Sequence, residues 1–203
     1  MLFRSGTVFS PLLPSLSLIR ANLAVKSTRS GQLLEQLLHS LKPDNQTPHR
    51  WGGLEMFLDK QVRHDSPEME YVYNHFETNL RDICSIAHRS GAKVIVSTVG
   101  VNLKDSPPFA SSHRSGLSDA EKQSWQTLYQ EGISHEATGE SEQAISCYQR
   151  AAQIDATFAD LQYRLGRNFQ RAGDYKTAKN YYLNACQYDT LRFRADARIN
   201  EII

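Results

Sequence analysis

Cysteine is scarce in this sequence, and the three cysteines that it contains form no recognisable site. Cys84, Cys147 and Cys186 are an odd number, without a CxxC pair and without the Cys/His spacing of zinc ligands. This pattern argues against a disulfide framework and against a zinc site. The residues are most simply explained as small apolar side chains, two of them on helical faces.

Long hydrophobic runs and an excess of charge of one sign are also missing. No stretch approaches the ~18 uninterrupted apolar residues of a membrane-spanning helix. The chain has 23 Lys and Arg against 22 Asp and Glu, so its net charge of +1 gives no reason to expect nucleic acid or an acidic membrane surface as partner. With 203 residues, 40% of them hydrophobic, the sequence predicts a soluble chain of one large or two small domains.

Acidic residues are absent from the first 34 positions, which contain four basic residues and six serines. This composition resembles a transit peptide. Pro11 and Pro14 interrupt the amphipathic pattern that such a peptide needs, which favours an ordinary segment of a truncated domain. Both interpretations remain open, and the sequence does not assign a compartment.

Apolar periodicity predicts helices in the first half of the chain. One helix or two short ones are expected between residues 16 and 41, where leucines recur at three- and four-residue spacing. A clearer helix is expected from the N-cap Ser66, with Pro67 at its first position, to Gly91. The two expected apolar stripes are Leu33, Leu34, Leu37, Leu38 and Leu41, and then Met69, Val72, Tyr73, Phe76, Leu80, Ile83 and Ala87.

A β-branched run follows the second of these helices. Val94, Ile95, Val96, Thr98 and Val99 are predominantly apolar without alternation, which is typical of a strand buried on both faces of a parallel sheet. No other segment predicts a comparable strand, and "GTVFS" at residues 6–10 is too short. We therefore expect residues 1–116 to be part of a domain whose other strands lie outside this chain.

The second half of the chain repeats itself. From Trp125 onward, residues recur at a spacing of 34, the period of the helix-turn-helix unit called the tetratricopeptide repeat (TPR), and residues 117–190 resemble two such units. Small residues would allow close helix packing, the tyrosines would fill the space between paired helices, and the second glycine of each unit would end its first helix. The matched pairs are Gly132/Gly166, Gly139/Gly173, Ala144/Ala178, Tyr148/Tyr182, Ala151/Ala185 and Asp155/Asp189.

In TPR proteins the first helix of each unit lines a concave face, and carrying those positions over predicts a protein- or peptide-binding surface. The cations and the amide of Arg167, Gln170 and Arg171 suit a carboxylate or an acidic peptide, although a solvated face without a ligand is the competing interpretation. The predicted positions are Gln126, Tyr129, Ile133, Glu136, Asp160, Tyr163, Arg167, Gln170 and Arg171.

A capping helix is expected at residues 191–203. Leu191, Ala195, Ile199 and Ile202 stand at helical spacing in "TLRFRADARINEII" and would cover the open end of the two repeats. The sequence stops inside this predicted helix without a capping residue, which favours a truncated reading frame.

The run "FLDKQVRHDSPEMEYVYNHFETNLRDICSIAHRSGAKVIVSTVGVNLKDSPPFAS" resembles bacterial SGNH/GDSL-type hydrolase-like proteins with inserted TPR units. The resemblance implies a flavodoxin-like sheet with a Gly-Asp-Ser nucleophile, Gly and Asn oxyanion donors, and an Asp-x-x-His pair. None of these motifs occurs in the chain. Ser97 and His113 are better explained as a strand serine and a loop histidine than as catalytic groups, while Asn102, Lys104 and Asp105 would edge the active site of a complete parent protein.

The expected fold is therefore a partial flavodoxin-like α/β region at residues 1–116, an all-α array of two TPR units at residues 117–190, and a capping or returning segment at residues 191–203. The predicted function is a protein-interaction or scaffold module within a truncated hydrolase-like protein, without catalytic residues, metal or cofactor. Two alternatives remain: an ester hydrolase or acyl-transfer enzyme that needs the missing flanking segments, and a stand-alone TPR adaptor. The parent would be a bacterial protein, exported or membrane-anchored.

Overall fold

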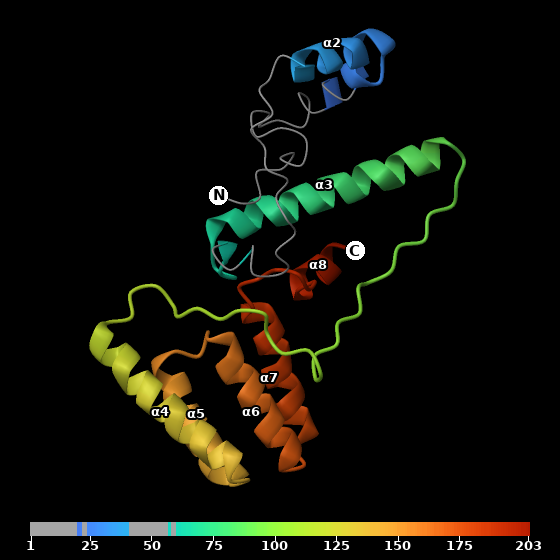
Figure 1. Cartoon of the computed structure of the whole chain (residues 1–203). Coiled ribbons are helices and arrows are strands. Elements are labelled where there is room, and N and C mark those ends of the chain that lie inside the picture. Colours follow the sequence, from blue (N-terminus) through green and yellow to red (C-terminus); the bar gives the residue numbers. More distant parts are fainter. Residues whose placement is uncertain (1–19, 22–23, 41–56, 58–59) are drawn as a thin grey trace. The chain divides into compact units, whose positions relative to one another are not determined.

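The computed structural model describes residues 20–21, 24–40, 57 and 60–203, and the regular structure within them is helical (Figure 1). Residues 57–203 form one compact unit. The helices of this unit are α3 (Pro67–Arg89), α4 (Asp119–Ala137), α5 (Ser141–Ile154), α6 (Ala159–Arg171), α7 (Tyr175–Tyr188) and α8 (Ala197–Ile202). Helix α2 (Arg29–Ser40) belongs to the other unit, residues 1–56, and is described separately.

The prediction of an α/β region at residues 1–116 is wrong, because the described residues include no β-strand. Residues 94–99 pass along the side of the unit as a chain without regular structure (Figure 1). Their β-branched side chains favour an extended backbone, but a strand also needs a neighbouring strand to complete its hydrogen bonds, and the described chain supplies none. The short segment at residues 6–10 lies outside the described residues.

The helical repeats are confirmed by two antiparallel hairpins, α4 with α5 and α6 with α7 (Figure 1). A Cβ added at Gly132 would lie 2.4 Å from the Tyr148 ring, and one added at Gly166 would lie 2.8 Å from the Tyr182 ring. In both hairpins the glycine leaves the space that the tyrosine of the second helix fills, as the repeat spacing predicts.

The turn inside each hairpin also follows the prediction. Gly139 has φ of 81° and Gly173 has φ of 85°, a left-handed conformation that ends α4 and α6 with little cost for glycine alone. At the other end of α4, the Ser118 side chain accepts a hydrogen bond from the Glu121 N–H, and the Glu121 carboxylate accepts one from the Ser118 N–H. This capping box fixes the entry into the array at residue 118.

The core of the unit lies between the hairpins. Trp125 is 1% exposed and stacks on Tyr129, and its Nε1 donates a hydrogen bond of 3.1 Å to the Asp155 carbonyl. Leu161 and Leu165 of α6 complete the same cluster. The first helix of the second repeat therefore packs against both helices of the first, which orients the two repeats relative to each other.

Helix α3 begins and ends where its sequence predicts, but only the start of its apolar stripe is buried. Met69 and Tyr73 are buried, whereas Ile83 remains 62% exposed. The Tyr73 hydroxyl donates to the Asp196 carboxylate, and Arg198 of α8 forms a bidentate ion pair with Glu70 at 2.7 and 2.8 Å. The N-terminal half of α3 is thus held against the C-terminal segment, while Ile83 and Ile86 of its C-terminal half remain exposed.

The C-terminal segment is less helical than predicted. Helix α8 starts only at Ala197, because Asp196 caps it by accepting the Ile199 N–H at 3.1 Å. Leu191 is buried in the irregular residues before it, against the end of the second repeat. Among the helices, α8 contacts α3, and the predicted capping role of residues 191–203 stays a prediction.

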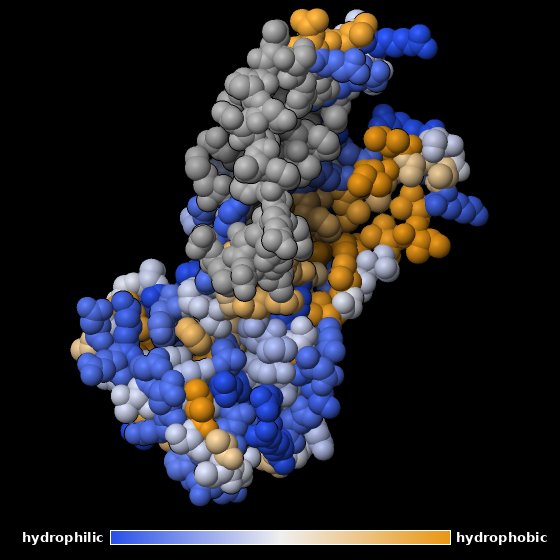
Figure 2. All heavy atoms as spheres, viewed as in Figure 1, coloured by the Kyte–Doolittle hydropathy of each residue, from blue (hydrophilic) through white to orange (hydrophobic). Residues whose placement is uncertain are grey.

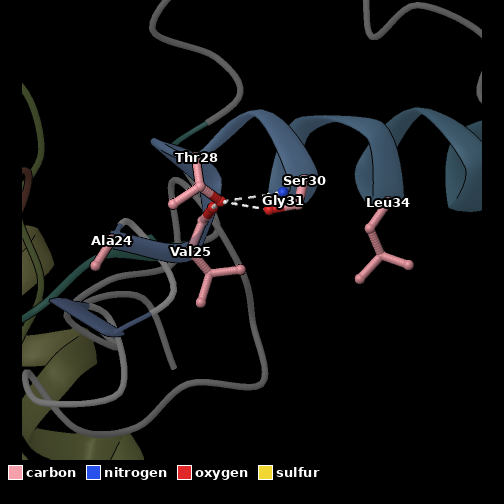
Figure 3. Close-up of a pocket in the computed structure, with 6 residues that line it drawn as sticks. All are labelled: Ala24, Val25, Thr28, Ser30, Gly31 and Leu34. Atoms are coloured by element: carbon pink, nitrogen blue, oxygen red, sulfur yellow. Dashed lines mark hydrogen bonds between the residues drawn. The ribbon is translucent and has the colours of Figure 1, made fainter.

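Helix α2 shows how a small residue allows a tight helix start. The Thr28 hydroxyl accepts the Gly31 N–H at 3.1 Å, and a Cβ on Gly31 would lie 1.9 Å from the Val25 carbonyl oxygen (Figure 3). A shallow depression beside this turn is lined, among the described residues, by small and uncharged side chains. Leu33, Leu34 and Leu37 of the predicted stripe are exposed, and Leu41 lies outside the described residues.

Candidate peptide-binding groove

The residue that ties the two repeats together is Glu136, near the end of α4. Its side chain is only 7% exposed, and its carboxylate lies 2.9 Å from Arg164, 3.6 Å from Arg167 and 3.5 Å from Arg171. The Tyr148 hydroxyl donates a further hydrogen bond of 2.9 Å to it. Glu136 was predicted as a ligand-binding residue, but in the structure its charge is already paired with arginines of the second repeat.

A second cross-repeat contact joins Tyr129 of α4 to Asp160 of α6. The Tyr129 hydroxyl donates to the Asp160 carboxylate, and the Nε of Arg164 lies 2.8 Å from the same carboxylate and 3.0 Å from the tyrosine oxygen. Burial, together with the hydrogen bond to Asp160, raises the pKa of Tyr129 far above its usual value. Arg164 was missed by the sequence interpretation because it does not stand at a concave-face position of the TPR pattern.

The remaining predicted residues of the second repeat surround a recess of about 370 Å³ that also contains two residues from the loop before α4. We call this recess the basic pocket. The Tyr163 hydroxyl donates to the Lys104 carbonyl at 2.7 Å, and the Tyr182 hydroxyl donates to the Gln170 side chain at 2.8 Å. The pocket is lined by Lys104, Asp105, Tyr163, Arg167, Gln170, Arg171 and Tyr182.

The pocket carries an excess of positive charge. Lys104, Arg167 and Arg171 line it together with one carboxylate, Asp105, and the buried Glu136 partly neutralises the two arginines from below. Neither arginine is buried, since their side chains remain 41% and 45% exposed. The exposed ends of Lys104, Arg167 and Arg171 can therefore attract a carboxylate and donate hydrogen bonds to it.

The other predicted binding residues lie elsewhere. Gln126 lines a separate shallow depression on the surface of α4, and Ile133 packs against the core cluster. Asn102 accepts the Asp105 N–H at 3.0 Å and so shapes the loop without lining the pocket. The predicted concave-face residues other than Gln126 thus fall into two groups. Tyr129, Ile133, Glu136 and Asp160 make contacts within the core or between the repeats, whereas Tyr163, Arg167, Gln170 and Arg171 line the basic pocket.

The loop that delivers Lys104 continues across the ends of both hairpins, and we call residues 103–114 the strap. Asp189 accepts the N–H groups of Phe109 and Ala110 at 2.9 and 3.1 Å, and Asp155 accepts the Arg114 N–H at 3.0 Å. Arg194 donates to the Ser106 carbonyl at 2.7 Å. The strap is therefore held by the repeats at several points and forms one wall of the basic pocket.

The role of the two aspartates was missed by the sequence interpretation, although their recurrence at the repeat period was visible. Asp155 and Asp189 are each 2% exposed. Burial acts to raise the pKa of Asp155, but hydrogen bonds from Thr157, Arg114 and His113 outweigh it and hold that pKa below its ordinary value. Asp155 anchors the turn between the repeats, Asp189 anchors the turn after the second repeat, and both anchor the backbone of the strap.

The residues weighed as catalytic do not come together. The Nδ1 of His113 lies 2.9 Å from the Asp155 carboxylate, and the imidazole packs against Trp125 and Phe158. Ser97 is exposed in the segment after α3. His113 is thus a partner of a structural aspartate, and among the described residues no serine is hydrogen-bonded to it.

The described residues include no candidate metal site, since no group of three or more His, Cys, Asp or Glu side chains among them is placed to hold an ion. Cys147 and Cys186 are buried, and burial raises the pKa of both thiols. In the same part of the chain, every helix is too short or too polar to cross a membrane.

Comparison with known families decides the nature of the hairpins. The tetratricopeptide repeat model matches residues 126–158 and residues 159–190, which correspond to α4 with α5 and α6 with α7. These hairpins are tetratricopeptide repeats. No curated protein and no solved structure matches the chain. The hydrolase resemblance has no support, and the inferences of a bacterial source and of a truncated reading frame, which accompanied it, have none either.

Proposed function

We propose that the chain is a protein-interaction module in which the second TPR unit holds an acidic segment of a partner protein in the basic pocket. TPR arrays bind peptides along the face made by their first helices, and four of the predicted residues of that face, Tyr163, Arg167, Gln170 and Arg171, line this pocket. The observation that carries the proposal is that Lys104 joins Arg167 and Arg171 around one recess.

The chemistry of the pocket favours a carboxylate over other ligands. The arginines and Lys104 can donate several charge-assisted hydrogen bonds, and the Gln170 side-chain NH2 is a further donor, because the Tyr182 hydroxyl already donates to the Gln170 oxygen. Tyr163 and Tyr182 also provide apolar ring surface for the stem of an aspartate or glutamate side chain. A partner segment with acidic residues, either internal or at a chain end, matches this arrangement.

Fluorescence anisotropy with labelled peptides tests the proposal. The probe is a short glutamate-containing peptide with a free C-terminal carboxylate, compared with its glutamine analogue and with its amidated form. Binding should be strongest for the acidic peptide and should weaken as salt rises, because the contributing charges are exposed to solvent. Equal binding of the acidic peptide and its glutamine analogue would contradict a carboxylate-selective pocket.

Lys104→Gln is the most informative variant, because the Lys104 ammonium forms no ion pair among the described residues and its loss should not disturb the Glu136 cluster. We expect its affinity for the acidic peptide to fall by about fivefold, the upper end for one exposed charge pair. Lys179→Gln is the matched control, since Lys179 is an exposed lysine on α7 that does not line the pocket. If both variants weaken binding equally, the effect reflects total charge and not the pocket.

A further inference from the structure

The most exposed apolar segment of residues 57–203 lies after α3, away from the basic pocket. The exposed fractions of its side chains alternate, with Val94 at 42%, Ile95 at 95% and Val96 at 42%, and Val99 is at 48%. Apolar side chains gather along this segment and the neighbouring end of α3 in the space-filling view (Figure 2). Alternating exposure is the pattern of an extended chain with one side chain on each face in turn.

The backbone of this segment is also unpaired. In the part of the chain that the structure describes, residues 93–98 make no backbone hydrogen bond. Val99 makes two, both to Asn200 of α8: its N–H donates to the Asn200 side-chain oxygen at 2.8 Å, and its carbonyl accepts from the Asn200 Nδ2 at 3.1 Å. The Asn200 amide thus occupies the position that a residue of a neighbouring strand would take.

This contact identifies which edge of the segment is open. In an extended chain the peptide groups of alternate residues point to opposite edges, so Lys93, Ile95 and Ser97 share the edge of Val99, beside α8. The groups of Val94, Val96 and Thr98 point to the other edge. The segment bows outward on the side away from α8, where no described helix accompanies it (Figure 1).

We propose that this open edge pairs with the same segment of a second copy of the chain, as an antiparallel two-stranded ladder centred on Val96. In that register Val96 exchanges both hydrogen bonds with Val96 of the second copy, and Val94 pairs with Thr98 of the second copy. All three residues of the open edge gain partners, and the pairing obeys the two-fold symmetry that most protein dimers have.

The side chains fit this register. Lys93 lies opposite Val99, so no like charges face each other across the ladder, and the pairs between β-branched residues are those that stabilise sheets. A segment of another protein would have to match both the register and the β-branched side chains, whereas a second copy supplies both automatically. The ladder adds a second strand at the open edge and leaves the two hydrogen bonds between Val99 and Asn200 in place.

A charge exchange at Val96 tests the proposal with the full chain. Val96→Lys and Val96→Glu each place like charges opposite each other at the two-fold axis, so each variant alone should dimerise about tenfold more weakly than the unchanged protein. An equimolar mixture should recover dimers, because lysine then faces glutamate. Ser97→Lys is the matched control: it adds the same charge one residue away, opposite Ile95 and not opposite itself, and should dissociate the dimer less than Val96→Lys.

Sedimentation equilibrium at several protein concentrations gives the dimer affinity in each case. Concentration-dependent dimers whose affinity falls about tenfold in both Val96 variants and recovers in their mixture support the proposal. A single monomer mass at every concentration up to about a millimolar, the range of the weakest specific associations, overturns it. An unchanged dimer affinity in both Val96 variants, or a mixture that fails to restore the affinity, also overturns it, because the contact then lies elsewhere.

Amide exchange supplies a second readout that depends on the register. In the dimer, the amides of Val94, Val96 and Thr98 should be protected, and their protection should rise with protein concentration. Those of Ile95 and Ser97 should exchange freely at all concentrations. Protection that does not depend on concentration would show that another part of the same chain covers the segment, and the proposal would be wrong.

Discussion

At the residue scale, the positions with the least freedom are the glycines that face the tyrosines. A Cβ at Gly132 would lie 2.4 Å from the ring of Tyr148, which is fully buried and cannot move aside. We expect Gly132→Ala to lower the free energy of unfolding by about 2 kcal/mol, because overpacking outweighs the gain in helix propensity. Urea unfolding measures the change.

Gly100 provides the control for that substitution. An added Cβ at Gly100 meets no atom within 4 Å, and its φ is not positive. Gly100→Ala should therefore change the free energy of unfolding by less than about 0.5 kcal/mol. Equal effects at Gly132 and Gly100 would mean that the glycine at the repeat position does not serve to admit the tyrosine ring.

Asp155 gives the protein an acid-sensitive contact. Its pKa in the folded chain is below the ordinary value, so its contribution is fully present above the ordinary aspartate pKa and is lost as the pH falls through the lower folded value. Stability should therefore decline as the pH drops below about 4. Asp155→Asn should lower stability at pH 7 by about 2 kcal/mol and flatten this decline.

Thermal unfolding between neutral and acidic pH measures the change. Asp119→Asn is the control, because the Asp119 side chain is fully exposed on the first turn of α4. It should leave both the stability at neutral pH and the acid decline nearly unchanged. If the acid decline of Asp155→Asn matches that of the unchanged protein, the buried carboxylate is not the group that responds to acid.

At the element scale, α3 depends on a few contacts at its N-terminal half. The hydroxyl of Tyr73 donates to the buried carboxylate of Asp196, whereas Tyr71 is 68% exposed on the same helix. Tyr73→Phe leaves a buried carboxylate without that donor and should cost about 1 to 2 kcal/mol, and Tyr71→Phe should cost almost nothing. Each substitution removes one hydroxyl from the same helix, and only the Tyr73 hydroxyl meets Asp196.

Amide exchange along α3 gives an independent test of this arrangement. Because the apolar stripe is buried at Met69 and Tyr73 but not at Ile83, the C-terminal turns should exchange faster than the N-terminal ones. Tyr73→Phe should raise exchange mainly in the N-terminal turns. Uniform protection along α3 would show that its exposed stripe is covered in solution.

At the scale of the whole molecule, the strap and the segment before it should differ in resistance to protease. The backbone of residues 93–98 makes no hydrogen bonds among the described residues, whereas the strap is bound by Asp155, Asp189 and Arg194. At low protein concentration, trypsin should cut after Lys93 well before it cuts after Lys104 or Arg114. Mass spectrometry of a digestion time course identifies the order of cleavage. Early cleavage after Arg114 would show that the strap is not held in place by these contacts.

The sequence by itself determined the repeats. The 34-residue recurrence of glycine, alanine and tyrosine fixes both hairpins, because those residues act through contacts within one unit and its neighbour, at short distances along the chain. The start and end of α3 were predictable for the same reason, since Pro67 and Gly91 act locally. The strand prediction failed because a β-branched run favours an extended backbone locally but cannot supply the neighbouring strand that a sheet needs.

Only the tertiary structure decided how the predicted site residues are used. Glu136 and Gln170 stand at equivalent concave-face positions, 34 residues apart, yet Glu136 is buried in an inter-repeat ion cluster whereas Gln170 lines the basic pocket. Lys104 reaches that pocket because Asp155 and Asp189 hold the strap across the repeats, from more than forty positions away. Contacts between segments so distant along the chain depend on packing as a whole, and no local pattern encodes them.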